Sequence, residues 1–313
     1  MKKLVLTSLL ILAAVFIFAA GQTETSDGAW APDRDVQWYC TSSPGGGSSI
    51  FTQSIIEIIK TEGLVDQEIL INYKTDGGGA VGRREVSGKG NDTTILTFNN
   101  GDLQPLVQIE GGDLDNFTPL AVMATDGQVL LVPADSPFKT AKDFIAAAEG
   151  GKRIIMGGSK GDDVNLFNKI KEQVGGDLEY LMSDSTGDAL TQILGGSIEV
   201  VIAKPAASIA FVESGDLRPL MVATRDRLND PFDAPTLKEL GYDIELTVYR
   251  GIVGPKDMSD EAVAFWSDIF GKVAATDQWK DGYLKKKILN GNHLPANEAI
   301  GYMQAFEDIY TAK

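Results

Sequence analysis

Short apolar, β-branched runs alternate along the chain with longer segments in which apolar residues recur every three or four positions. Segments of the second kind predict helices; Ile55, Ile58 and Ile59, for example, form a one-faced stripe that follows Ser48 and Ser49. The short runs predict strands at residues 36–41, 68–73, 93–99, 129–133, 153–157, 178–183, 198–203 and 217–224. Alternation of this kind is typical of βαβ units, so we expect an α/β protein with two mostly parallel sheets.

Two longer β-compatible segments, residues 118–133 and 244–253, differ from the other runs. We interpret them as crossovers between two domains, which together form a hinge. The first domain is then expected to comprise residues 36–123 and to be completed by residues 248–313. The second domain is expected to comprise residues 124–247.

The first residues have the pattern of an export signal. Lys2 and Lys3 precede an almost wholly apolar run at residues 9–20, and small residues stand at Ala19, Ala20 and Gly21. A membrane anchor is the alternative, but residues 4–20 are fewer than the ~20 apolar residues that a spanning helix requires. We therefore expect a signal peptide at residues 1–21, cleaved near Gly21, a flexible leader at residues 22–35 and a periplasmic location.

Composition excludes several classes of function. The 313 residues include 28 Lys and Arg, 44 Asp and Glu, one His and one Cys, which gives a formal charge of −16. One His and one Cys cannot build a thiolate or imidazole metal site, and the negative charge disfavours binding to nucleic acid. We expect no metal, no cofactor and no nucleic-acid partner. Cys40 has no second cysteine with which to form a disulfide.

Glycine-rich segments lie where expected strands pass into helices, at residues 44–49, 77–82 and 157–161. Loops of this type place several backbone N–H groups at the start of a helix, where they stabilise a carboxylate or phosphate. The alternative is that each loop is only a tight turn in which glycine supplies a positive φ. Together, the three loops could surround an anion.

Two of these loops also match enzyme motifs. Gly77, Gly79 and Gly82, with Asp102 downstream, imitate a dinucleotide-binding fingerprint, although nicotinamide cofactors are not ordinarily supplied outside the cytoplasm. Gly157-x-Ser159-x-Gly161 imitates a nucleophile elbow, with His293 downstream as a hydrolase requires. A secreted α/β serine hydrolase that uses Ser159 and His293 is therefore the main enzymatic alternative.

The order of motifs over residues 36–313 resembles the TctC or Bug family, the extracytoplasmic receptors of tripartite tricarboxylate transporters. The motifs that carry this resemblance are Pro44-Gly45-Gly46-Gly47, Gly77-Gly78-Gly79-Ala80-Val81-Gly82, Asp188-Ala189-Leu190 with Gly195-Gly196, Ser214-Gly215-Asp216-Leu217-Arg218-Pro219-Leu220, Ala234-Pro235-Thr236-Leu237-Lys238-Glu239-Leu240-Gly241 and Tyr249-Arg250-Gly251-Ile252-Val253-Gly254-Pro255.

The resemblance implies a two-domain periplasmic-binding-protein fold, a type II-like Venus flytrap. Such a protein is a receptor and not an enzyme: it captures a small di- or tricarboxylate or related acid and delivers it to the membrane subunits of its transporter. We expect a monomer. A sensor or adaptor that binds the same ligand without transport is a further alternative.

The resemblance also implies that the first two glycine-rich loops hold the ligand's carboxylate. The expected ligand-binding residues are Ser42, Ser43, Gly45, Gly46, Gly47, Ser48, Ser49, Gly77, Gly78, Gly79, Ala80, Val81, Asn99, Ser159, Lys160 and Lys204. Ser49 and Ala203 stand where the family often has Asp. Lys160, Lys204 and Arg250 are basic side chains that could pair with a second carboxylate.

Overall fold

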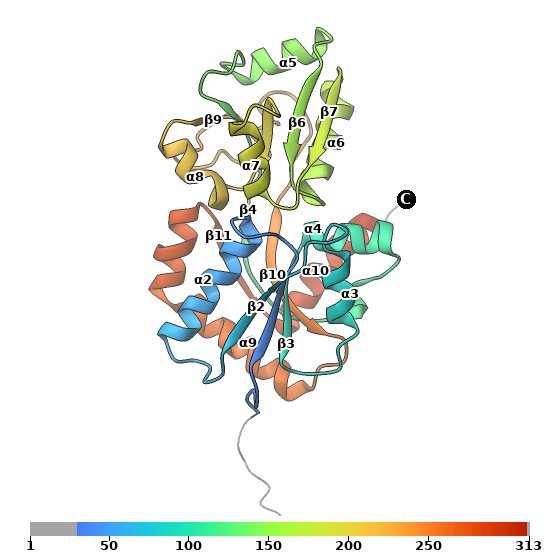
Figure 1. The fold of residues 1–313 in the computed structure, drawn as a ribbon, viewed down its shortest axis with the longest axis vertical. Helices are drawn as coiled ribbons and strands as arrows, with labels where there is room; N and C mark the ends of the chain where they lie inside the picture. Colours follow the sequence, from blue (N-terminus) through green and yellow to red (C-terminus); the bar gives the residue numbers. More distant parts are fainter. Residues whose placement is uncertain (1–29, 312–313) are drawn as a thin grey trace, which may run out of the picture. The chain divides into compact units, whose positions relative to one another are not determined.

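Two separate β-sheets organise the chain in this computed structural model, which describes residues 30–311 (Figure 1). From Ala31 onward the chain forms one structural unit. We call the two sheets with their helices the large lobe and the small lobe. The expected signal peptide at residues 1–21 and most of the expected leader lie outside the described residues. No helix among those that the structure describes is long and apolar enough to cross a bilayer.

The large lobe holds a six-stranded sheet in the order β11-β4-β10-β3-β1-β2. Its elements are β1 (Val36–Cys40), α2 (Gly47–Thr61), β2 (Ile69–Tyr73), α3 (Ala80–Ser87), β3 (Thr94–Asn99), α4 (Asn100–Pro105), the π-helix η1 (Leu106–Glu110), the 3-10 helix η2 (Leu114–Asn116), β4 (Phe117–Asp126), β10 (Val248–Pro255), α9 (Asp260–Ala275), the π-helix η3 (Gln278–Lys285), β11 (Asn290–Pro295) and α10 (Ala296–Thr311).

The small lobe holds a five-stranded sheet in the order β7-β6-β8-β5-β9. Its elements are β5 (Val129–Pro133), α5 (Ala141–Glu149), β6 (Ile154–Gly158), α6 (Asp162–Val174), β7 (Leu178–Met182), α7 (Thr186–Leu194), β8 (Val200–Ala203), α8 (Pro205–Glu213) and β9 (Leu217–Val222). All eight expected strands are present, with ends within two residues of those expected.

Both sheets are mixed, so the expectation of mostly parallel sheets is wrong in this detail. β1 pairs in parallel with β2 and β3, whereas β10 runs antiparallel to both β3 and β4, and β11 runs antiparallel to β4. In the small lobe β6 is parallel to β7 and β8, while β5 is antiparallel to β8 and β9. All the antiparallel pairs except β11 with β4 involve β5 or β10, which arrive from the other lobe and not through a βαβ crossover.

The chain passes between the sheets twice. β4 ends in the large lobe at Asp126, and β5 begins in the small lobe at Val129. The return passage follows β9, which ends at Val222, and leads to β10, which begins at Val248. The small-lobe sheet is therefore built from one continuous stretch of chain, whereas the large-lobe sheet is built from two.

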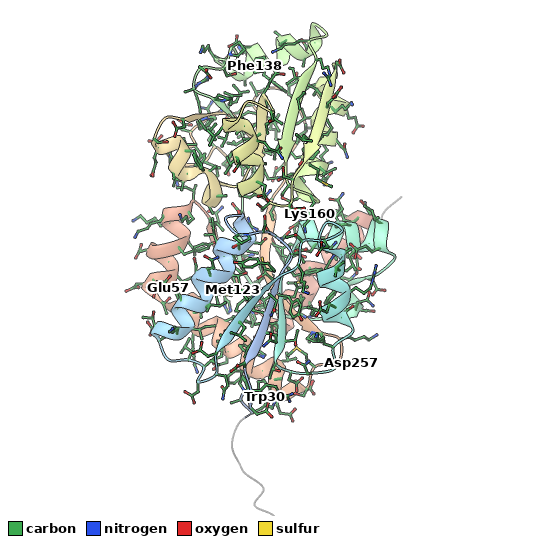
Figure 2. All side chains as sticks on the ribbon, viewed as in Figure 1. Trp30, Glu57, Met123, Phe138, Lys160 and Asp257 are labelled. Carbon is green, nitrogen blue, oxygen red and sulfur yellow. The ribbon has the colours of Figure 1, made fainter. Side chains whose placement is uncertain are left out.

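Each lobe has its own apolar interior. Figure 2 labels one buried side chain in each lobe, Met123 in the large lobe and Phe138 in the small lobe. Trp38, Trp266 and Phe270 pack together in the large lobe, with Trp266 stacked on Phe270 at 5.9 Å between ring centroids. In the small lobe Phe138 meets the edge of Phe144 at 5.8 Å, and both rings are buried. Each such side chain contributes about 1.5–3 kcal/mol by leaving water, so each lobe is a rigid support for the loops at its surface.

Candidate functional site

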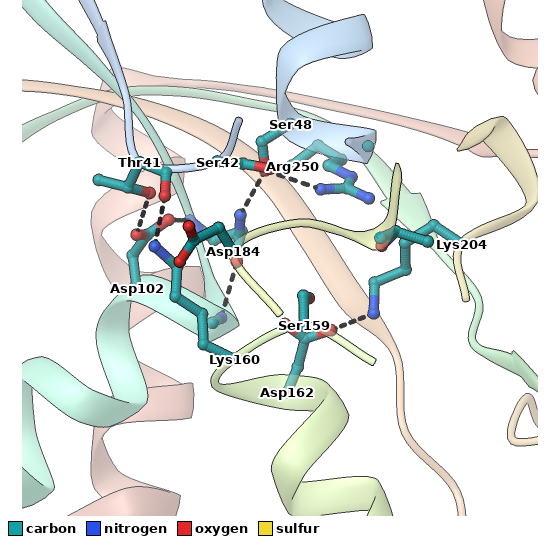
Figure 3. Close-up of a pocket in the computed structure, with 14 residues that line it drawn as sticks. Thr41, Ser42, Ser48, Asp102, Ser159, Lys160, Asp162, Asp184, Lys204 and Arg250 are labelled. Carbon is teal, nitrogen blue, oxygen red and sulfur yellow. Dashed lines mark hydrogen bonds and ion pairs between the residues drawn. The ribbon is translucent and has the colours of Figure 1, made fainter. Parts of the chain in front are cut away.

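A small cavity lies between the two lobes and is lined by residues from both (Figure 3). The large lobe contributes Thr41, Ser42, Gly47, Ser48, Asn99, Gly101, Asp102 and Arg250, and the small lobe contributes Ser159, Lys160, Asp162, Asp184, Thr186 and Lys204. Its volume is about 30 Å³, which is room for about two water molecules. The lobes are therefore closed on each other.

The start of α2 forms part of the large-lobe wall. The run of glycines after Pro44 delays the helix until Gly47, and its N-cap, Gly46, has no side chain to bond the first N–H groups. The first turn contains no acidic residue. Uncapped N–H groups and the positive end of the helix dipole therefore face the cavity at Gly47 and Ser48, where they favour an anion.

The side chain of Ser48 joins this helix end to the neighbouring strands. Its Oγ is 3.0 Å from Nδ2 of Asn99 and 3.2 Å from Nη1 of Arg250, and both nitrogens donate to it. Arg250, on β10, is only 2% exposed and also forms an ion pair with Asp126. Burial acts to lower the pKa of Arg250, but Asp126 outweighs it and raises that pKa. Arg250 is therefore a permanent positive charge that is already paired.

In the small lobe, the ammonium of Lys204 forms ion pairs with two adjacent carboxylates, Asp162 and Asp163. Lys204 precedes α8, and the two acids occupy the first turn of α6, where the helix dipole favours negative charge. Asp163 also accepts hydrogen bonds from the backbone N and the Oγ of Ser159, both at 2.8 Å.

These contacts set the ionisation of the three groups. Burial opposes charge on Lys204, yet the two acids outweigh it and raise the pKa of Lys204. Burial also acts to raise the pKa of Asp163, but Lys204 and the hydrogen bonds from Ser159 lower it overall. Burial raises the pKa of Asp162 to about 6, even though Lys204 opposes the rise. Asp162 is thus the least well compensated of the three charges.

Lys160 reaches from the small lobe to the large lobe, where its Nζ donates to the carbonyl oxygen of Thr41. It makes no ion pair with the described residues, and burial lowers its pKa. Gly79 leaves room for it: a Cβ on Gly79 would lie 2.5 Å from Nζ of Lys160. Gly79 also has a φ of 86°, which strongly favours glycine.

The first glycine-rich loop meets the start of α7 across the cleft. Ser43 Oγ donates to Oδ2 of Asp188 at 2.5 Å, and a Cβ on Gly187 would lie 3.2 Å from the backbone of Gly45. Close backbone contact also occurs between Gly161 of the small lobe and Gly101 of the large lobe. Glycine at these positions therefore allows the lobes to approach each other closely.

The structure brings part of the expected set together. Seven of the expected residues line the cavity: Ser42, Gly47, Ser48, Asn99, Ser159, Lys160 and Lys204. Ser43, Gly45 and Gly46 lie in the same loop but face α7.

The other expected residues lie outside the cavity lining. Ser49 Oγ points away, toward the hydroxyl of Tyr73 at 2.9 Å. Gly77, Gly78 and Gly79 precede α3, and Gly78 and Gly79 lie beside Lys160. Ala80 and Val81 begin α3, and Val81 is 42% exposed.

Several lining residues were not among the expected ones: Thr41, Gly101, Asp102, Asp162, Asp184 and Thr186. Arg250 was expected only as a basic side chain near the cleft. Most of these residues follow the carboxyl end of a strand, the edge at which ligands of open α/β sheets gather. That position is the signal that could have found them.

The geometry does not assemble either enzyme motif. Ser159 donates to Asp163, whereas His293 lies on β11 in the large lobe with its ring against Gly271 of α9. Asp102, the acid of the dinucleotide-like pattern, accepts from Thr41 Oγ1 at 2.5 Å and from Arg83 Nη1 at 2.8 Å. Within residues 30–311, no group of three or more His, Cys, Asp or Glu side chains is placed to hold a metal ion.

Comparison with known sequences gives a family match over residues 59–286, to the TctC tripartite tricarboxylate transporter family receptors. The protein BugT of Bordetella pertussis is 22% identical over 80% of this chain and 79% of its own length. A Cupriavidus necator protein, the UPF0065 protein in the gbd 5' region, is 31% identical over 50% of this chain. That match spans about half of the relative's length, 48%.

Solved structures share the fold. Rpa4515 of R. palustris, solved with adipate, superposes with a TM-score of 0.81 at 19% identity, over 89% of this chain and 95% of its own. MatC of Rhodopseudomonas palustris, solved with bound malate, gives 0.78 at 18% identity, over 89% and 99% of the two chains. A periplasmic transporter structure gives 0.81 at 21% identity, over 89% and 95%. The two-domain periplasmic-binding-protein fold expected from the sequence is thereby confirmed.

Proposed function

Because the chain belongs to the TctC family of tripartite tricarboxylate transporter receptors, we propose that it is a periplasmic receptor that captures a small organic acid between its lobes. The observation that carries this proposal is the cavity between the lobes, which polar side chains and a helix end from both lobes line. A ligand bound there contacts both lobes at once, so it favours the closed arrangement over any open one.

The carboxylate of the ligand is proposed to bind at the start of α2. Gly47 and Ser48 offer uncapped N–H groups, Ser42 adds a hydroxyl, and Lys160 supplies a cation with no carboxylate partner among the described residues. Carboxylate ligands in two proteins of the same fold, malate and adipate, are consistent with this class of ligand.

Closure requires a hinge, and the two passages of the chain between the sheets are proposed to supply it. They lie at residues 126–129 and 222–248. Gly127 stands in the first passage, and a few residues at the ends of strands can absorb the change in φ and ψ that a hinge needs. The closed receptor would then deliver its ligand to the membrane subunits of a tripartite transporter.

A thermal-unfolding screen tests the proposal. The mature protein is to be mixed with mono-, di- and tricarboxylates, amino acids and aromatic acids. Any ligand that binds only the folded state raises its stability by about 2.7 kcal/mol at one hundred times the dissociation constant. We expect at least one acid to raise the unfolding midpoint, and mass spectrometry of the purified protein to identify a retained acid. A screen in which every acid leaves the midpoint unchanged would contradict the proposal.

A further inference from the structure

The cavity contains fewer available cations than its lining suggests. Lys160, Lys204 and Arg250 all line it, but Lys204 is paired with Asp162 and Asp163, and Arg250 is paired with Asp126. Three carboxylates therefore already neutralise two of the three cations. A dicarboxylate ligand would find one cation, Lys160, for two negative groups.

The same cavity contains an acceptor that the protein leaves unused. Oδ2 of Asp162 accepts from Lys204 and from Nε2 of Gln128 at 3.3 Å, but Oδ1 has no hydrogen-bond partner among the described residues. The side chain is 9% exposed and lines the cavity, and Oδ1 faces the large lobe at Gly101, whose added Cβ would lie 2.5 Å from it. Asp184 lines the cavity as well and is exposed (Figure 3).

The two walls of the cavity therefore favour opposite charges on a ligand. Its large-lobe wall offers N–H groups at the start of α2, with Lys160 nearby, whereas its small-lobe wall offers the unpartnered carboxylate oxygen of Asp162, whose side chain is mostly buried. A second carboxylate placed beside Asp162 would face Asp163 as well, and buried like charges repel strongly. A cation placed there would form a charge-assisted hydrogen bond with Oδ1.

We propose that the ligand is an amino carboxylate, which binds with its carboxylate at the start of α2 and its ammonium group on Oδ1 of Asp162. This inference rests on the proposed receptor function and narrows its ligand class. Asp162 then determines specificity, because it selects a cationic end where a dicarboxylate would bring a second negative charge. The raised pKa of Asp162, caused by burial, agrees with a carboxylate that a further cation would stabilise.

Matched compounds test the ligand class in the wild-type protein. The probes are β-alanine, malonate and 3-hydroxypropanoate, together with 4-aminobutanoate, succinate and 4-hydroxybutanoate. Within each triplet the carboxylate is constant, and only the far end changes from ammonium to carboxylate or hydroxyl. Calorimetric titration at pH 7.5 should show the amino acid binding about tenfold or more tighter than the diacid of the same length.

The substitution Asp162→Asn tests the residue. It keeps the shape and leaves Lys204 paired with Asp163, so the variant should fold, with an unfolding midpoint at pH 7.5 equal to or above that of the wild type. The amino carboxylate should lose about thirtyfold or more in affinity, while the diacid should bind as before or better. Asp66→Asn, at an exposed position outside the cavity, makes the same change of charge and should leave every probe unaffected.

The outcomes separate the two proposals. If a diacid or a hydroxy acid is the tightest ligand, or if Asp162→Asn leaves amino carboxylate affinity unchanged, the inference is wrong while the receptor function stands. The titrations of the wild-type protein decide the ligand class even if Asp162→Asn fails to fold. If no probe binds and the wider screen finds no acid either, the receptor function itself fails.

Discussion

Two adjacent carboxylates, Asp162 and Asp163, share the ammonium of Lys204 inside the small lobe. Lys204 was expected to pair with a ligand carboxylate, whereas in the structure its ammonium pairs with these two acids, and the reason is local. α6 begins with both acids, and its first turn lies where β8 delivers Lys204. A charge that is buried without a partner is costly, so a lysine and two acids brought this close pair with each other first.

The ionisation of Asp162 predicts a specific dependence of stability on pH. Because burial raises the pKa of Asp162 to about 6, the folded state holds a proton that an unfolded chain releases near pH 3.9. This contribution to stability is fully present below about pH 3.9 and is lost as pH rises through about 6. Asp162→Asn removes this titration. The free energy of unfolding of the variant, measured relative to that of the wild type, should therefore increase from pH 4 to pH 7.

Urea unfolding of the wild type, Asp162→Asn and the control Asp66→Asn at pH 4 and pH 7 measures this change in relative stability. Free energies of unfolding that differ between Asp162→Asn and wild type by the same amount at pH 4 and pH 7 would contradict it. The wild-type curve alone is not sufficient, because other carboxylates titrate in the same range.

Gly46 tests how closely the lobes must approach. Its φ of −77° suits any residue, so alanine brings no backbone strain, but the new Cβ would lie 2.8 Å from Cβ of Ser185 in the small lobe. Such overpacking costs about 1–3 kcal/mol. The contact with Ser185 adds to this cost only when the lobes are closed, whereas the new Cβ also meets Oγ of Ser42 in its own loop, a short side chain that can rotate away. Gly46→Ala should therefore weaken binding of the identified acid by about five- to a hundredfold.

Gly90→Ala is the matched control for this substitution, because a Cβ at Gly90 meets nothing within 4 Å. Titration calorimetry with both variants makes the comparison. Wild-type affinity in Gly46→Ala would mean that the bound protein never brings Gly46 and Ser185 this close.

At the scale of the elements, the start of α7 makes two kinds of contact, one within the helix and one with the large lobe. Ser185 caps the helix by accepting from the backbone N of Asp188, and it donates to Oδ2 of the same residue at 2.8 Å. Oδ2 of Asp188 also accepts from Ser43 of the large lobe. The helix end is therefore a stable unit by itself, and the bond from Ser43 exists only when the lobes meet.

Ser43→Ala should remove the contact between the lobes and leave the contacts within α7 intact. Loss of one hydrogen bond between the lobes is expected to cost about 0.5–1.5 kcal/mol of ligand affinity, while the unfolding midpoint without ligand stays the same. Ser87→Ala, which removes an exposed bond to Arg84 within α3, serves as the control. Equal affinities in the two variants, measured by calorimetry, would show that this contact contributes nothing to the bound state.

Elements were predictable from the sequence where local pattern determines them. The expected strands were all found because each is a short apolar run between turn residues. β11 was not predicted because its first residues are polar and show no strand pattern: Asn290, Gly291, Asn292 and His293. Only pairing with β4 makes this segment a strand. The mixed directions of the strands were also not predicted, because they depend on where strands such as β10, which lies between β4 and β3, insert into a sheet.

The candidate site, too, was predictable only where local pattern determines it. Glycine-rich loops at the ends of strands are visible in the sequence, and Gly47, Ser48 and Lys160 do line the cavity. Asp162 and Asp184 are two of 44 acidic residues. Both follow the carboxyl end of a strand, but this position alone does not show which of its polar residues line the cavity. Their role depends on contacts with the other lobe, which local pattern does not encode.

For the molecule as a whole, the cavity volume requires motion. At about 30 Å³ it is far smaller than the roughly 300–1,000 Å³ typical of ligand pockets, so a ligand can enter only after the lobes separate. Without ligand, an open population should therefore exist, and binding should reduce it.

Small-angle scattering measures this population shift directly. We expect a smaller radius of gyration with a saturating ligand than without one, in the same buffer. Gly90→Ala should behave like wild type. A ligand that raises the unfolding midpoint but leaves the radius unchanged would retain binding and exclude hinge closure.

The position of β10 has a consequence for how the protein is made. β10 lies between β3 and β4 in the large-lobe sheet, yet it is synthesised more than 120 residues after β4 ends. Until then β3 and β4 have no shared neighbour, whereas all five strands of the small lobe have already been made. Because domains fold as units when their chain is complete, the small lobe can form first on a growing chain. In that order of folding, the apolar faces of the first ninety residues of the large lobe stay uncovered until the last sixty are made, so we expect this half of the protein to be the more prone to aggregation during synthesis.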